Sequence, residues 1–190
     1  PCMECDDCLK GDYALCKHYS FIGSRQFGSF AEYVVVPERN AVKFDEEVTF
    51  EQGAFFEPAT VALHGLQRLD YKGGGTVAIL GGGTIGLLTA QFAKIFGARK
   101  VYVFDILDER LALASRLGEI EGINSSDKDW YEKAMEATEG KGFDYVYETA
   151  GNTITMKMAF RLAGSKAQVC FIGTPTSELC FSADEWEALK

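Results

Sequence analysis

The sequence lacks the features that mark several large classes of protein. Its 190 residues contain no run of Lys and Arg, and the formal net charge is −9 with a pI near 4.8. Both facts argue against a nucleic-acid-binding surface. There is also no secretory signal, internal repeat or low-complexity tract, so we expect a cytoplasmic protein with a sizeable core.

The one long uncharged stretch, residues 73–93, is poor in apolar side chains. Seven of its 21 residues are glycine, three are threonine and one is glutamine, which leaves ten apolar residues. A helix in contact with lipid needs about 20 predominantly apolar residues. We therefore expect no membrane span.

The glycines of that stretch form the most informative motif. An apolar run at residues 76–80 predicts a β-strand, and a helical pattern follows it. Three glycines between them fit G-x-G-x-x-G, a pattern that gains its meaning after a strand and at the start of a helix. There the backbone can approach a pyrophosphate, and the helix N-terminus offers N–H donors to it. The residues expected at this site are Gly81, Gly83, Thr84, Ile85 and Gly86.

An acidic residue stands where a dinucleotide site needs one. The second apolar run, residues 100–105, ends in Asp105, about 20 residues beyond the glycine motif. A carboxylate at this place binds the adenosine ribose and repels a 2′-phosphate, so the pattern favours NAD over NADP. A plain glycine-rich turn in an α/β core is the alternative.

The rest of the second half alternates helical and strand patterns, as a parallel doubly wound sheet requires. Helices are expected at residues 107–117, at 126–139 and up to residue 162, and strands from residue 143 and at 167–173. Ligands bind beyond the carboxyl ends of such strands, although these positions also suit ordinary turns. The candidate cofactor contacts there are Thr149, Ala150, Ile172, Gly173 and Thr174.

Four cysteines open the chain in the spacing C-x2-C-x2-C-x7-C. Four thiolates so close in sequence can surround one tetrahedral metal ion, and the first three are too tightly spaced to pair as separate disulfides. The wide last gap and the absence of a following proline favour structural zinc over an iron–sulfur cluster. The four candidate ligands are Cys2, Cys5, Cys8 and Cys16.

The segment between the two motifs predicts strands at residues 29–36 and 41–44 and a helix from residue 49 that Pro58 breaks. Within it, Glu57 is the one carboxylate of an apolar decapeptide. Because a buried carboxylate needs a cation or several donors, Glu57 is either a metal or substrate ligand or is turned to solvent at the helix boundary.

The sequence also predicts whether four other side chains are buried or exposed. His64 lies in an apolar helical pattern and is expected to be a hydrogen-bonded core residue, whereas His18 is expected at the surface. Cys170 and Cys180 lie in apolar runs and are expected to be buried, inert thiols.

In this order the patterns resemble the zinc-dependent medium-chain dehydrogenases, in particular the sorbitol and galactitol-1-phosphate dehydrogenases of the polyol branch. Besides the cysteines and the glycine motif, the resemblance rests on Gly28-Ser-Phe-Ala-Glu-Tyr33 and Glu57-Pro-Ala-Thr-Val-Ala-Leu-His64. Two shorter sequences resemble the galactitol-1-phosphate enzymes especially, Cys8-Leu-Lys-Gly11 and Phe21-Ile-Gly-Ser-Arg25.

The resemblance implies part of a GroES-like β domain with a structural zinc lobe, followed by a doubly wound parallel Rossmann sheet. We expect residues 1–50 in the first domain, 51–72 in connecting helices and 73–190 in the NAD-binding domain. Further implied roles are an acidic ligand near a catalytic zinc for Glu57 and a place beside adenosine for Arg110. Substrate contacts are implied for Phe21, Ser24 and Arg25, with Arg25 either facing a phosphate or remaining a solvated charge.

The implied activity is NAD-dependent oxidation of a polyol or sugar alcohol, phosphorylated or not, by a zinc-containing enzyme that forms dimers or tetramers. Such enzymes carry further catalytic-zinc ligands upstream of the cysteine lobe and a last strand beyond the position of residue 190. We therefore expect this chain, which starts without Met, to be an interior piece of a longer enzyme. The alternatives are an NAD-binding module without turnover and a zinc-free reductase.

Overall fold

The computed structural model describes residues 1–187 and divides into two compact units, Pro1–Val48 and Thr49–Lys190. The regular structure of the first unit is limited to a short helix, α1 (Asp6–Lys10), and two 3-10 turns, η1 (Tyr13–Leu15) and η2 (Glu38–Asn40). Helix α1 carries two acidic residues in its first turn and ends at Gly11 in the left-handed conformation, φ 90°, a common helix stop.

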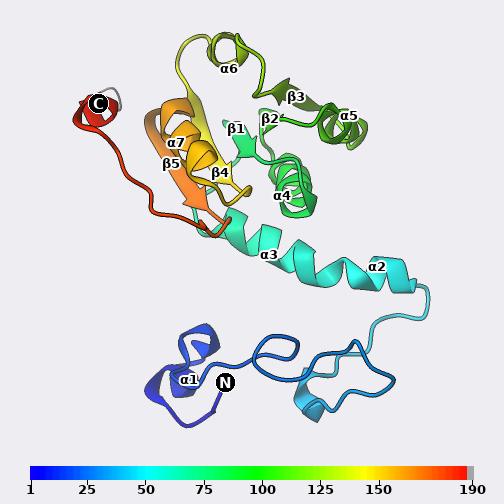
Figure 1. Ribbon diagram of the computed structural model, residues 1–190. Coiled ribbons are helices and arrows are strands. Elements are labelled where there is room, and N and C mark those ends of the chain that lie inside the picture. Colours follow the sequence, from blue (N-terminus) through cyan, green and yellow to red (C-terminus); the bar gives the residue numbers. More distant parts are fainter. Residues whose placement is uncertain (188–190) are drawn as a thin grey trace. The chain divides into compact units, whose positions relative to one another are not determined.

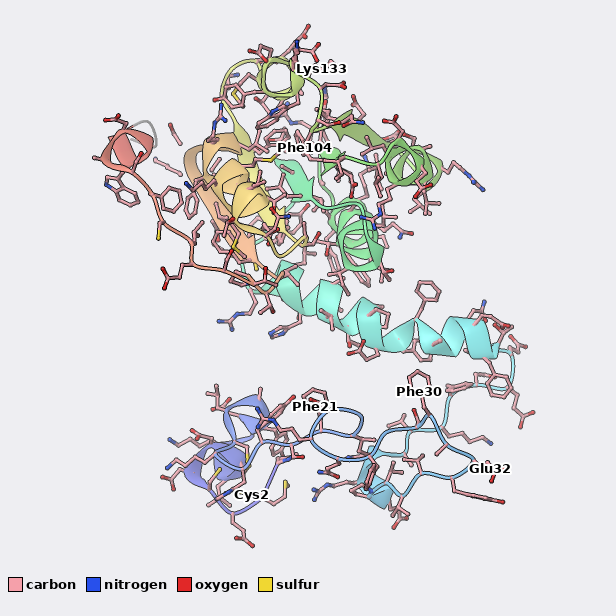
Figure 2. The ribbon with its side chains drawn as sticks, viewed as in Figure 1. Cys2, Phe21, Phe30, Glu32, Phe104 and Lys133 are labelled. Atoms are coloured by element: carbon pink, nitrogen blue, oxygen red, sulfur yellow. The ribbon has the colours of Figure 1, made fainter. Side chains whose placement is uncertain are left out.

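The strands predicted at residues 29–36 and 41–44 are wrong. In the described part of the first unit, the one bridge between extended segments joins Ile22 and Gln26. A strand is stable only when a neighbour takes up its N–H and C=O groups, and no described segment of this unit pairs with these residues. Large side chains of this segment are exposed on both faces, Tyr33 as well as Phe30 (Figure 2 labels Phe30).

The second unit is built on a five-stranded parallel sheet with the strand order β3-β2-β1-β4-β5 (Figure 1). Its strands are β1 (Thr76–Leu80), β2 (Lys100–Asp105), β3 (Ile120–Asn124), β4 (Phe143–Glu148) and β5 (Ala163–Phe171). Its helices are α2 (Phe50–Ala54), α3 (Phe56–Gln67), α4 (Thr84–Ile95), α5 (Asp108–Arg116), α6 (Trp130–Ala137), α7 (Thr153–Leu162) and α8 (Ala183–Glu187).

Helices cover both faces of this sheet, and the side chains of β1 alternate between two cores. Val77 and Ile79 pack in the core formed with α3, α4 and α5. Ala78 and Leu80 pack in the core formed with α6 and α7, which also holds the buried Phe104 (Figure 2). Burial on both faces explains why β1 reads as a continuous apolar run.

Helix α2, the first helix before the sheet, begins at a recognisable capping signal. Thr49 and Gln52 form a capping box: the Thr49 hydroxyl accepts the Gln52 N–H at 3.2 Å, and the Gln52 side chain accepts the Thr49 N–H at 2.9 Å. The predicted break between two helices is present, but it lies at Phe55 rather than at Pro58, which is inside the first turn of α3. Proline is tolerated in the first turn, where its missing N–H would have no intrahelical partner.

Two elements of the second half differ from the prediction. Strand β3 was not predicted, because Ile-Glu-Gly-Ile-Asn at the sheet edge carries only two apolar residues. Helix α6 begins at Trp130 rather than at Ser126, whose N–H and hydroxyl both donate to the Asn124 side chain. The capping-box pattern Ser182-Ala-Asp-Glu185 predicts a helix from there to residue 190; α8 begins at Ala183, and residues 188–190 lie outside the described residues.

Candidate cofactor and metal sites

The carboxyl ends of β1 and β4 meet where the winding of the sheet reverses. The chain runs from β1 outward to β2 and β3, then returns to β4 on the other side of β1. The loop after β1 and the turn after β4 are in contact: the Thr149 hydroxyl donates to the carbonyl oxygens of Leu80, at 2.9 Å, and Gly81, at 3.1 Å. Such a switch point is where open α/β sheets bind ligands.

The glycines of the motif fall into two kinds. Gly81 has φ 107°, and a β-carbon on Gly86 would collide with the Gly81 carbonyl oxygen and come within 2.8 Å of the Thr149 hydroxyl. At Gly83, in contrast, a β-carbon would meet no protein atom within 4 Å. Gly83 is also the N-cap of α4, and no side chain caps that helix. Open space beside an uncapped helix N-terminus suits a pyrophosphate. The first turn of α4 consists of Thr84, Ile85 and Gly86.

Asp105 lies beside this loop with its side chain 5% exposed. Its Oδ2 accepts the Gly82 N–H at 2.7 Å and a guanidinium N–H of Arg110 at 3.2 Å, while its Oδ1 accepts the Leu107 N–H at 2.9 Å. Burial raises the pKa of Asp105, but these three donors outweigh burial and hold the pKa below its usual value. Asp105 is therefore an anion tied directly to the glycine loop.

The turns that follow β4 and β5 also touch each other. A β-carbon on Gly151 would lie 2.9 Å from the Thr174 carbonyl oxygen. The N–H groups of Ile172 and Gly173 both donate to the backbone carbonyl of Glu148, at 2.8 and 3.0 Å. The structure thus brings together five of the predicted cofactor contacts, Thr149, Ala150, Ile172, Gly173 and Thr174.

Sequence reasoning did not single out Glu148, the last residue of β4, which is completely buried. Its Oε1 accepts the N–H groups of Ala150, at 2.9 Å, and Gly151, at 2.8 Å, and the hydroxyl of Thr155 at 2.7 Å. A signal was present, because a carboxylate at the end of a strand next to the central one must find partners if it is buried.

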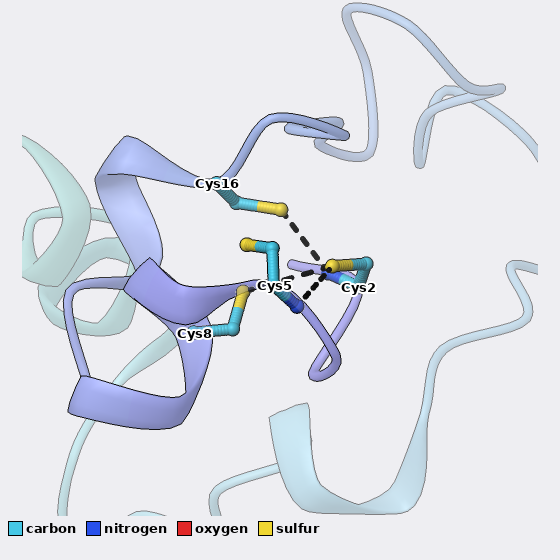
Figure 3. Close-up of side chains that lie close together, drawn as sticks. All are labelled: Cys2, Cys5, Cys8 and Cys16. Atoms are coloured by element: carbon cyan, nitrogen blue, oxygen red, sulfur yellow. Dashed lines mark hydrogen bonds between the residues drawn. The ribbon is translucent and has the colours of Figure 1, made fainter.

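In the first unit, the four cysteines converge on one point (Figure 3). Their sulfur atoms all lie within 4.8 Å of one another, and those of Cys2 and Cys8 are 4.0 Å apart. A tetrahedral zinc ion with Zn–S bonds of about 2.3 Å places its sulfur ligands about 3.8 Å apart, so this donor set fits zinc. With four thiolates there is no open position, as expected for a structural site.

The surroundings give these thiols very different acidities. A hydrogen bond from the Cys8 N–H lowers the pKa of Cys5 to about 6, whereas burial raises the pKa of Cys8 to about 11. Burial also opposes ionisation of Cys16, but the N–H groups of Cys2 and His18 outweigh it and lower the pKa. Four thiolates this close would repel one another, so a cation among them favours the ionised form of all four near neutral pH.

The residues assigned to substrate and catalytic metal by resemblance are all exposed. Glu57 lies in the first turn of α3, and among the described residues the four cysteines are the one group of three or more close metal-ligating side chains. In the first unit, Arg25 donates to the Tyr19 carbonyl oxygen at 2.7 Å and stacks on its ring at 5.7 Å. Phe21 and Ser24 are exposed beside it in the chain.

Three predicted burials are wrong, and one predicted exposure is confirmed. His64 is exposed, because α3 turns Ala62 and Leu66 inward instead. Cys170 in β5 is only half-buried, which still raises its thiol pKa, and Cys180 is exposed in the irregular segment before α8. His18 is exposed as predicted.

Among residues 1–187, no helix has the length and apolar character needed to span a bilayer.

Two family profiles match the sequence, "Alcohol dehydrogenase GroES-like domain" over residues 2–46 and "Zinc-binding dehydrogenase" over residues 84–186.

Individual relatives agree with these profiles. Galactitol 1-phosphate 5-dehydrogenase of Escherichia coli K12 is 40% identical over 179 residues, which cover 94% of this chain and 52% of that protein. A crystal structure of galactitol-1-phosphate dehydrogenase from Escherichia coli matches with a TM-score of 0.89 at 38% identity, covering 100% of this chain and 55% of that one.

A zinc-binding dehydrogenase from Sinorhizobium meliloti 1021, solved with NADP, matches with a TM-score of 0.88 at 34% identity and covers 99% of this chain and 56% of that one. The chain thus spans about half the length of the relatives it matches. Both profiles, the parallel sheet and the four-cysteine cluster agree: the chain belongs to the zinc-dependent medium-chain dehydrogenase family.

Proposed function

We propose that this chain is part of an NAD-dependent, zinc-containing dehydrogenase that oxidises a polyol or sugar alcohol. One observation carries the proposal. The N-terminus of α4 has no side-chain cap and has open space at Gly83, and Asp105 binds the neighbouring residue of the same loop, Gly82. In such an enzyme, a catalytic zinc polarises the substrate hydroxyl and the nicotinamide accepts hydride.

In this proposal, three parts of the second unit bind different parts of the cofactor. The glycine loop and the first turn of α4 hold the pyrophosphate, and Asp105 holds the adenosine ribose with Arg110 beside it. The turns at residues 149–151 and 172–174 hold the nicotinamide half. This assignment is supported by the contact between the two turns and by their place at the switch point of the sheet.

We assign NAD rather than NADP because of the charge at Asp105. Its buried carboxylate would face the 2′-phosphate of NADP, and burial strengthens the repulsion between like charges. Asp105→Ala should weaken NADH binding and narrow the difference between the affinities for NADH and NADPH. Equal affinity of the unchanged protein for both cofactors would contradict the assignment.

The test of cofactor binding compares two glycine variants at the two ends of α4. Gly83→Ala adds a methyl group where no protein atom lies within 4 Å, so folding should be unaffected while NADH affinity falls about tenfold. Gly97→Ala, also free of contacts but at φ 89°, should lower stability by about 1 kcal/mol and leave NADH affinity unchanged. NADH fluorescence and thermal melts measure both. Unchanged NADH affinity in Gly83→Ala would contradict the proposed site.

We further propose a structural zinc on Cys2, Cys5, Cys8 and Cys16, and a role for Glu57 near a catalytic zinc. The convergence of the four sulfur atoms supports the first, and the exposed position of Glu57 leaves it accessible for the second. Glu57→Gln should lower turnover and leave one zinc per chain bound by the cysteines, as elemental analysis would show.

For the substrate, we propose a polyol, with a phosphorylated polyol favoured. The similarity to galactitol 1-phosphate 5-dehydrogenase supports this choice, and Phe21, Ser24 and Arg25 are candidates to line the pocket. A panel of galactitol 1-phosphate, sorbitol and threonine with NAD tests it. Arg25→Ala should raise KM for the phosphorylated substrate alone. NADH binding without reduction of NAD by any alcohol would instead favour an NAD-binding module.

We also propose a dimer or tetramer. Strand β5 lies at one edge of the described sheet, and an edge strand presents main-chain groups that can pair with another chain. Light scattering coupled to gel filtration measures the mass of the particle, and a monomer at micromolar concentration would contradict this part of the proposal.

A further inference from the structure

Glu148 links three segments of the second unit at the carboxyl edge of the sheet. Its side chain accepts hydrogen bonds from the turn at residues 149–151 and from Thr155 in the first turn of α7. Its backbone carbonyl accepts hydrogen bonds from Ile172 and Gly173, at the end of β5. The carboxylate therefore holds the turn at residues 149–151, whereas the backbone carbonyl extends the pairing of β4 with β5 to the start of the second turn, whatever the side chain.

The second oxygen of this carboxylate is unusual. Among the described residues, Glu148 Oε2 is the one buried side-chain oxygen or nitrogen without a hydrogen-bond partner. It lies against Gly173, where a β-carbon would come within 2.7 Å of it. An unsatisfied buried oxygen costs free energy, so ordinary packing does not account for a glutamate here. The carboxylate instead buttresses the backbone on which the turn at residues 172–174 is built.

Hydrogen bonds of Glu148 reach only one half of the proposed cofactor site. The Glu148 side chain bonds to the turn at residues 149–151 and to α7, whereas Asp105 binds the glycine loop through the Gly82 N–H. The two buried carboxylates at the strand ends thus divide the site, Asp105 for the adenosine end and Glu148 for the nicotinamide end.

We propose that Glu148 is a positioning residue that sets the geometry of the nicotinamide-binding turns, an inference that rests on the proposed function. It does not touch the cofactor. It acts through the backbone N–H groups of Ala150 and Gly151, which its side chain binds, and through the packing of Oε2 against Gly173. A variant that loses its hydrogen bonds should therefore weaken binding of the nicotinamide half and spare the adenosine half.

The experiment compares NADH with ADP-ribose, which has the adenosine, pyrophosphate and second ribose but no nicotinamide. Glu148→Ala should raise the Kd of NADH about tenfold and that of ADP-ribose less than about twofold, because three hydrogen bonds to the turn and α7 are lost. Calorimetry on the full chain measures both ligands. An equal loss for both, or no loss for NADH, would overturn the proposal.

A pair of threonine variants keeps the test valid if Glu148→Ala fails to fold. Thr155→Val removes one of the three donors to Oε1 and should weaken NADH about threefold with ADP-ribose unchanged. Thr153→Val makes the same chemical change two residues earlier in α7, without a hydrogen bond to Glu148, and should change neither ligand. Equal NADH affinity in the two variants would also overturn the proposal.

Failure of the inference and failure of the proposed function give different results. If the unchanged protein binds neither NADH nor ADP-ribose, the proposed function is wrong. If it binds both and the variants do not change the ratio of the two affinities, only the role of Glu148 is wrong.

Discussion

The two units of the chain differ in how many apolar side chains they bury. In the first unit, Pro1–Val48, the only buried side chains are Cys8 and Cys16, while Phe27, Phe30 and other apolar side chains are exposed. In the second unit, two apolar cores lie on the two faces of the sheet. We therefore expect the first unit to depend for its order on a metal ion held by the four cysteines, and the second to depend on packing.

Removing the metal should produce the largest effect and should affect one unit only. A chelator, or Cys8→Ser, leaves the remaining thiols without the cation that holds them together, so the first unit should lose its protection from hydrogen exchange. The sheet of the second unit should keep its protection and its NADH affinity. Cys180→Ser, at an exposed cysteine outside the cluster, is the matched control and should change neither. Full protection of the first unit from hydrogen exchange in the presence of chelator would show that a metal ion does not order this unit.

Gly86→Ala should produce the largest effect on the second unit. A β-carbon there collides with the backbone carbonyl of Gly81, which cannot move away as a side chain would. We expect a loss of about 3 kcal/mol in the free energy of unfolding, measured with urea. Gly83→Ala, three residues earlier, has open space and should unfold like the unchanged protein. Equal stability of the two variants would contradict the tight packing inferred at Gly86.

Replacement of Asp105 should have a smaller effect, and that effect should depend on pH. The folded state holds the pKa of Asp105 below its unfolded value of about 3.9, so its contribution to stability is complete above that value and is lost as the pH falls through the lower, folded pKa. Asp105→Asn should cost about 1 kcal/mol at pH 7 and progressively less in acid. A cost that stays the same from pH 7 to pH 2 would show that the charge is not responsible.

The smallest effect is expected at the surface of the first unit. Lys43 and Glu46 form an ion pair of 3.9 Å with both side chains almost fully exposed. Water and salt screen such a pair, so Lys43→Ala should leave zinc content, hydrogen exchange and the unfolding midpoint unchanged. A measurable change at this position would mean that surface charges, in addition to the metal, order the first unit.

Most of the second unit could be predicted because its local patterns and its packing agree. Strand β1, the helix after it and Asp105 at the end of β2 follow from an apolar run, three glycines and one acid. Strand β3 was missed because at the sheet edge its residues need not all be apolar. His64 was misjudged because an apolar helical pattern does not say which side of the helix faces the core.

The first unit was predicted less well, because strand-like composition does not show whether a partner strand is present. Residues 29–36 have the β-branched and aromatic side chains of a strand, yet a strand exists only where a neighbour accepts its hydrogen bonds. The cysteine spacing, in contrast, was sufficient to predict convergence, because four cysteines at such spacing are typical of a tetrahedral metal site.

By itself, the sequence determined the parallel sheet, the glycine loop with its acid, and the convergence of the four cysteines, since each depends on residues close in the chain or on periodic burial. Only the tertiary structure revealed that Asp105 is bound to Gly82, that Gly86 packs on Gly81, and that Glu148 joins the turns after β4 and β5. The contacts of Asp105 and Glu148 join segments that are far apart in sequence, and no local pattern states which strands become neighbours. The contact of Gly86 with Gly81 is local, but it depends on the conformation of the turn between them.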